Sequence, residues 1–107
     1  MATIQENVRE ELNRLFDSSP ELTVKVPEHT LDALRRYVLD GLEPGGFLQA
    51  VLTNDLMEAC GRADVENSLC LPHIATFIYN CTPSHSHGSR DRYEAWIQEK
   101  RKNWEVA

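Results

Sequence analysis

Metal-binding and nucleophilic residue types gather in one short stretch of the chain. Cys81, His85 and His87 lie in a polar segment, and His73 precedes them. Thiolate and imidazole groups bind zinc, and a cysteine beside a histidine can act as a nucleophile with its general base. The spacing matches no standard structural zinc site, and no glycine-framed nucleophile accompanies it. The sequence therefore predicts no enzyme activity and no cofactor, with zinc binding by Cys81, His85 and His87 as an open alternative.

A second stretch, Pro44-Gly45-Gly46, could suggest an anion-binding loop at the start of a helix. It contains neither a Gly-x-Gly-x-x-Gly pattern nor a Gly-Lys-Ser/Thr pattern. The carboxylates of Asp40 and Glu43 beside it would also repel a phosphate group. We therefore expect Gly45 and Gly46 to have a structural role, as a corner that directs the helix after them.

The most apolar helical pattern follows this corner and predicts a central helix from Phe47 to about Gly61. Asn54 and Asp55 are unfavourable inside a helix, because their short polar side chains compete for backbone hydrogen bonds. We expect structural roles for both, with Asp55 bonded to a neighbouring loop or paired with Arg35 or Arg62. The apolar stripe expected in the core consists of Phe47, Leu48, Val51, Leu52, Leu56, Ala59 and Cys60.

Four further segments show helical patterns, so the sequence predicts an all-α, compact single domain of about five helices. The segment 3–17 has a stripe of Ile4, Val8, Leu12, Leu15 and Phe16. The segment 28–39 should stop at Asp40-Gly41. The segment 65–81 should follow an N-cap at Asp64 and kink or break at Pro72, and the segment 90–104 should follow Ser89. The expected core face of 65–81 is Leu69, Cys70, Ile74, Phe77 and Ile78.

These helices are expected to form one domain over residues 1–107, in which 1–19 could be an addition to a core of 27–104. A short extended linker is expected near residues 21–27, because apolar residues alternate there between two prolines. No apolar run approaches the roughly 20 residues of a membrane span, and no secretory signal is evident. Three widely spaced cysteines agree with a reducing, cytoplasmic location.

The net charge of −6 is concentrated in the middle of the chain, where residues 20–70 hold nine acids and four bases. This balance disfavours nucleic-acid binding, which depends on neutralising phosphates, and favours a basic protein partner. The alternative is that the acids only maintain solubility. The acids expected to contact a partner are Asp40, Glu43, Glu58 and Glu66. The basic residues of the last segment, Arg90, Arg92, Lys100, Arg101 and Lys102, offer a second possibility, in which the protein binds nucleic acid or modulates transcription.

From Pro27 to Trp96 the sequence resembles a family of small, mostly uncharacterised proteins encoded by phages and prophages. The residues that carry the resemblance are Thr30-Leu31-Asp32-Ala33-Leu34, Tyr37-Val38, Pro44-Gly45-Gly46-Phe47-Leu48, Ala50-Val51-Leu52, Asn54-Asp55-Leu56, Arg62-Ala63-Asp64, Phe77, Tyr79-Asn80 and Gly88-Ser89. Members of this type tend to carry a tryptophan where this chain has His87, which weakens any metal role for that histidine.

The resemblance implies a phage context, in which small acidic proteins without catalytic motifs often bind and block a host protein. We therefore expect a stoichiometric inhibitor that acts in the host cytoplasm by protein–protein binding. The most specific form of this expectation is an anti-CRISPR protein that binds a CRISPR–Cas component. The sequence identifies neither the target nor the oligomeric state.

Overall fold

Pro27 is the N-cap of α2 (Glu28–Asp40), the first helix of the described part of the chain. A computed structural model describes residues 26–106. Leu34, Tyr37 and Val38 recur at helical spacing and are fully buried. The helix ends because Gly41 adopts a left-handed conformation (φ 69°), from which its N–H donates to the Tyr37 carbonyl at 2.9 Å. The predicted helix over 28–39 is thus confirmed, one residue longer than expected.

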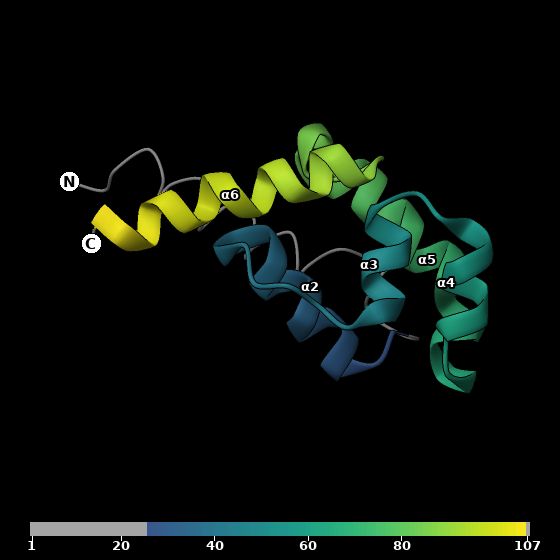
Figure 1. Ribbon diagram of the computed structural model, residues 1–107. Helices are drawn as coiled ribbons and strands as arrows, with labels where there is room; N and C mark the ends of the chain where they lie inside the picture. Colours follow the sequence, from purple (N-terminus) through teal and green to yellow (C-terminus); the bar gives the residue numbers. More distant parts are fainter. Residues whose placement is uncertain (1–25, 107) are drawn as a thin grey trace.

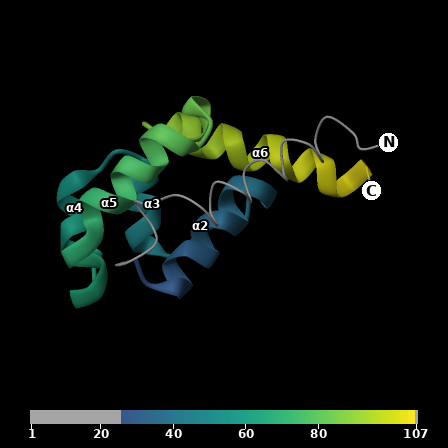
Figure 2. The same ribbon diagram turned by 180° about the vertical axis from the view of Figure 1, so that it is seen from behind.

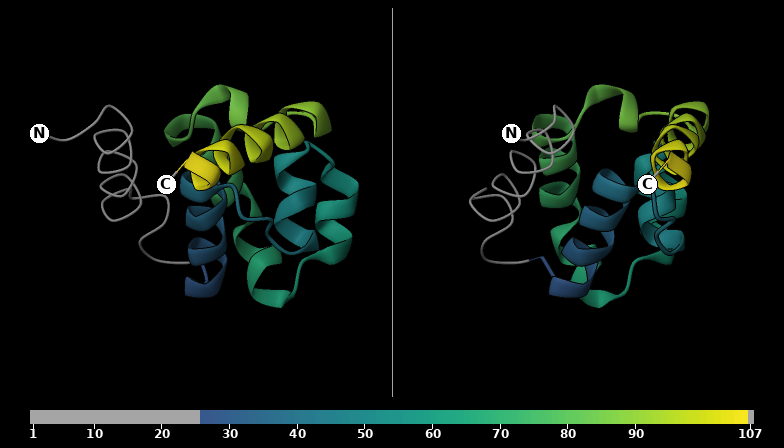
Figure 3. Two further views of the ribbon diagram at one scale, coloured as in Figure 1. Left: turned by 60° about the vertical axis from the view of Figure 1, so that its left-hand side comes forward. Right: turned by 90° about the vertical axis from the view of Figure 1, so that its left-hand side faces the viewer.

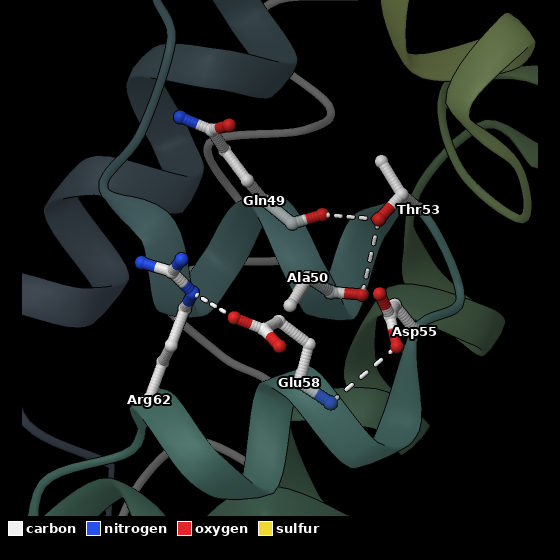
Figure 4. Close-up of polar contacts among 6 residues, drawn as sticks. All are labelled: Gln49, Ala50, Thr53, Asp55, Glu58 and Arg62. Atoms are coloured by element: carbon white, nitrogen blue, oxygen red, sulfur yellow. Dashed lines mark hydrogen bonds and ion pairs between the residues drawn. The ribbon is translucent and has the colours of Figure 1, made fainter.

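The predicted central helix is wrong, because the chain forms two shorter helices at this place. They are α3 (Gly46–Leu52) and α4 (Leu56–Arg62). Asn54 lies between them with φ 63°, a conformation that no helix interior allows. Figure 4 shows the Asp55 carboxylate accepting a hydrogen bond from the Glu58 N–H at 3.4 Å, as the N-cap of α4. Both residues have structural roles, but among residues 26–106 the Asp55 carboxylate neither bonds another loop nor pairs with an arginine.

Gly45 and Gly46 lead into α3 without using the backbone freedom of glycine. Gly45 is the N-cap with φ −67°, and the left-handed glycines of the described residues are Gly41 and Gly88 instead. Gly46 allows a close approach from α4, since a Cβ there would lie 2.7 Å from Arg62 Nη1. The Arg62 side chain pairs with Glu58 across one turn of α4 (Figure 4).

Helix α5 (Val65–Cys81) has 17 residues, as many as the helix at the end of the chain. It begins as predicted, with the Asp64 carboxylate accepting a hydrogen bond from the Asn67 N–H at 2.8 Å. It continues through Pro72, so the predicted alternative of a break there is wrong. Cys70, Ile74, Phe77 and Ile78 are buried as expected. Three residues expected in the core are instead exposed, namely Leu56, Cys60 and Leu69.

A short 3-10 helix, η1 (Ser84–Ser86), connects α5 to α6 (Arg90–Val106). The Ser89 hydroxyl accepts a hydrogen bond from the Arg92 N–H at 3.1 Å and so begins α6 as predicted. The buried side of α6 consists of Tyr93, Trp96 and Ile97, which recur at three- and four-residue spacing.

The helices pack into one compact all-α bundle, as predicted. In Figures 1 and 2, α6 crosses the C-terminal end of α2, and α3 and α4 run antiparallel side by side. α5 passes behind this pair in Figure 1, and Figure 3 shows the same bundle from two further directions. The shared core is built from residues of α2, α3, α5 and α6. Residues 26–106 contain no strand.

None of the helices within the described residues is long and apolar enough to cross a membrane. The predicted helix over 3–17 and most of the predicted linker over 21–27 lie outside the described residues.

Candidate functional site

The segment that holds the candidate metal ligands is folded by its own hydroxyl groups. Thr82 Oγ1 donates to the Ile78 carbonyl and Ser86 Oγ donates to the Pro83 carbonyl, both at 2.7 Å. His87 Nδ1 lies 3.2 Å from Thr82 Oγ1 and 3.1 Å from Ser86 Oγ. Because each hydroxyl proton already serves a carbonyl, the geometry assigns the proton of the His87 ring to Nδ1. His87 therefore donates from Nδ1 inside a structural network.

Electrostatics agree with a neutral His87. Burial lowers the pKa of His87 below its ordinary value, and the nearby charges of Arg92 and His85 lower it further. His85 is exposed and its ring contacts Trp96, with 5.0 Å between ring centroids. The two imidazoles thus have different surroundings, and no hydrogen bond joins His85 to Cys81 within the described residues.

Metal binding gains no support from this arrangement. Among residues 26–106, no group of three or more histidine, cysteine, aspartate or glutamate side chains is placed to hold a metal ion. Cys70 is fully buried, and burial raises the pKa of its thiol, which disfavours the reactive thiolate. The segment 82–88 instead connects helices of the bundle through hydrogen bonds. The Tyr37 hydroxyl donates to the Ser86 carbonyl at 2.6 Å, and the Gly88 N–H donates to the Leu52 carbonyl at 2.9 Å.

The four acids expected to contact a partner come from four successive parts of the chain. Asp40 ends α2 beside α6, and Glu43 follows in the exposed connection, where its charge contributes to raising the pKa of Tyr93 after the larger effect of burial. Glu58 lies on α4 and Glu66 in the first turn of α5, and the Arg62 side chain that pairs with Glu58 also reaches Gly46 at the start of α3.

The clearest exposed apolar group next to these acids lies on α4. Leu56 is 65% exposed and Met57 is 82% exposed, and Cys60 one turn later is also exposed. We call Leu56, Met57 and Cys60 the α4 surface. Ala59 is the single buried residue of this helix. Glu58 and Arg62 pair on a different side of α4, which faces α3 (Figure 4).

Pattern reading missed the α4 surface because it assigned Leu56 and Cys60 to the core stripe of one long helix. The available signal was the pair Asn54 and Asp55, which favours a helix stop followed by a new N-cap. A stop at this point changes the direction of every later side chain. Leu56 and Cys60, which continue the apolar stripe in the sequence, therefore face the solvent.

The basic residues of α6 are largely engaged within the protein. Arg92 Nη1 donates to the Ser84 carbonyl at 3.3 Å and to the His87 carbonyl at 3.5 Å. Arg90 pairs with Glu94 at 3.7 Å, and Lys100 Nζ lies 4.6 Å from the centroid of the Trp96 ring. These contacts leave few free cations on α6 for a row of phosphates.

No family model, curated protein or solved structure matches this chain.

Proposed function

We propose that this chain is a non-enzymatic protein that binds another protein and inhibits it, with the α4 surface as the main contact. The observation that carries the proposal is the composition of α4. The helix buries only Ala59, yet it exposes Leu56 and Met57 to solvent. A helix that contributes one alanine to the core has no folding reason to carry these two large apolar side chains.

The chemistry of the α4 surface fits a protein partner. Contiguous exposed apolar residues mark interaction sites, and methionine adapts its shape to an opposing surface. Glu58 and Glu66 lie on α4 and at the start of the next helix, and the chain carries a net charge of −6. The fitting partner has an apolar hollow bordered by lysine and arginine, because such a border would guide an acidic protein to it.

The most specific form of the proposal is a phage-type inhibitor of a bacterial defence protein, namely an anti-CRISPR protein that binds a CRISPR–Cas component. It is supported by the resemblance of the sequence to phage proteins and by the absence of a metal-binding group among the described residues. Stoichiometric binding by a stable bundle would be sufficient for such inhibition, because blocking a surface requires no chemistry.

A phage-challenge assay tests the proposal. Bacteria with an active CRISPR–Cas system would express the wild type, Met57→Glu or Gln98→Glu, and would meet a phage that the system targets. Gln98 is an exposed residue of α6 and serves as the matched control. We expect plaques with the wild type and the control, and few with Met57→Glu, because a charge at a binding hot spot costs about 2 kcal/mol, roughly 30-fold in Kd.

Affinity purification from the same cells provides the second readout. The wild type and Gln98→Glu should retain one protein in a fixed molar ratio, and Met57→Glu should lose it. If Met57→Glu retains the partner as well as the wild type, the α4 surface is not the contact. If the wild type leaves immunity intact in every system tried and retains no partner, the inhibitor proposal fails.

A further inference from the structure

α5 is apolar on two opposite sides. Its inner side places Cys70, Ile74 and Phe77 in the core. Its outer side carries residues at helical spacing that are all exposed, with Val65 and Leu69 76% exposed and Tyr79 80% exposed. We call these residues the outer α5 stripe: Val65, Leu69, Pro72, Thr76 and Tyr79.

The outer side of α5 also lacks the charges that a solvent-facing helix normally carries. Glu66 is the single Asp, Glu, Lys or Arg side chain of this helix. A helix with apolar residues on two opposite sides is typical of an element that is packed on both of these sides. Within residues 26–106 the outer α5 stripe has no cover, so its composition points to a further element that packs there.

The preceding part of the chain offers an element of matching size. The segment 3–17 has the helical stripe of Ile4, Val8, Leu12, Leu15 and Phe16. At 1.5 Å per residue, a helical stripe from Ile4 to Phe16 is about 18 Å long, and the stripe from Val65 to Tyr79 is about 21 Å long. The two apolar stripes therefore agree in length.

The point where the chain enters the bundle favours this segment over other occupants. Thr30 Oγ1 donates to Asn67 Oδ1 at 2.8 Å, which places the first turn of α2 beside the first turn of α5. Val26 packs against the core directly before α2. Residues 18–25 can span up to about 26 Å when extended, enough to return along α5. A short tether also gives the segment an effective concentration in the millimolar range, which a second copy reaches only at high protein concentration.

We propose that the segment 3–17 forms a helix whose apolar stripe covers the outer α5 stripe of the same chain. The segment completes the bundle as a second layer over α5 and leaves the α4 surface open. This inference does not rest on the proposed function, since it concerns a different helix and predicts a change in stability instead of a change in partner binding.

A double-mutant cycle in the full chain tests the contact, with urea unfolding as the measurement. The variants are Leu12→Glu, Leu69→Glu and the pair together, with Asn13→Glu as the control outside the apolar stripe. Each single change should lower the folding constant by about tenfold or more, because a charge cannot stay in an apolar seam. The double variant should be no less stable than the weaker single variant, since one substitution already detaches the segment. The control should match the wild type.

The same proteins should be monomeric by light scattering at low and high concentration. Additive losses in the double variant, or wild-type stability for Leu69→Glu, would show that the segment does not cover α5. A dimer that Leu69→Glu converts to a monomer would assign the stripe to a second copy and would equally overturn the proposal. If Leu12→Glu is unfolded before urea is added, the cycle is repeated with Leu12→Ala and Leu69→Ala, and the same criteria apply.

Discussion

Two tyrosines stack in the core with 5.3 Å between ring centroids, yet their hydroxyl groups have different surroundings. The Tyr37 hydroxyl donates to the Ser86 carbonyl at 2.6 Å. The Tyr93 hydroxyl is buried and has no hydrogen-bond partner among the described residues. Burial raises the pKa of both phenols, so both hydroxyl groups stay protonated at ordinary pH. The same chemical group thus stabilises the fold at one position and costs free energy at the other.

Replacing each tyrosine with phenylalanine should separate these two effects. Tyr37→Phe should lower the free energy of unfolding by about 1–3 kcal/mol, because it leaves the buried Ser86 carbonyl without its donor. Tyr93→Phe should be neutral or stabilising, since it removes a buried hydroxyl that forms no bond. Chemical denaturation followed by circular dichroism measures both. Equal losses for the two variants would contradict the assignment of the hydrogen bond.

At the scale of the elements, helix ends determine how α2 meets α6. Gly41 stops α2 with φ 69°, and a Cβ there would lie 2.5 Å from Lys100 Cβ on α6. Glycine is therefore required twice at this position, once for the backbone conformation and once for the close approach. Gly61 on α4 has open space around its Cβ position.

Alanine at these two glycines should have opposite effects. Gly41→Ala should lower the free energy of unfolding by about 2–4 kcal/mol, from left-handed strain and the contact with Lys100. Gly61→Ala should raise it by up to about 1 kcal/mol, because alanine favours the helix. Thermal unfolding of both variants under one buffer condition makes the comparison. A stable Gly41→Ala variant would mean that α6 can move away from the end of α2 at little cost.

At the scale of the whole molecule, the sequence predicted the fold class because its signals were local. Asp64, Ser89 and Gly41 mark helix ends through their own chemistry, and the structure uses all three. Cys70, Ile74, Phe77 and Ile78 of α5 were predicted from periodicity and are buried.

Two other predictions failed, the first at a local helix stop and the second because the outcome depends on packing. The stripe through Leu56 and Cys60 looked continuous, but the left-handed Asn54 turns the chain before it is complete. Leu69 belonged to an equally good stripe on the opposite side of α5, and periodicity cannot decide which of two apolar sides faces the core. The candidate surface on α4 was missed because the helix stop at Asn54 and Asp55 was read as a feature inside one long helix.

The charge of the whole molecule yields a prediction for nucleic acid. With a net charge of −6 and several α6 cations engaged internally, the full chain should show no saturable binding to duplex DNA or RNA at physiological salt. Fluorescence polarisation titrations at about 50 and 200 mM salt measure this. A variant with Lys100, Arg101 and Lys102 changed to glutamine serves as the control and should behave like the wild type. Tight binding with a steep salt dependence that this variant loses would favour the alternative function.

The two bonds that Tyr37 makes with late parts of the chain have a consequence for synthesis. Its hydroxyl bonds a residue 49 positions later, and its carbonyl accepts the Trp96 indole N–H, 59 positions later, at 3.1 Å. A ribosome releases the N-terminal side first, so α2 emerges long before these partners. A nascent chain that stalls before Trp96 would keep Tyr37 uncovered, and chaperones and proteases would encounter it. Completion of the core is thus tied to translation of α6.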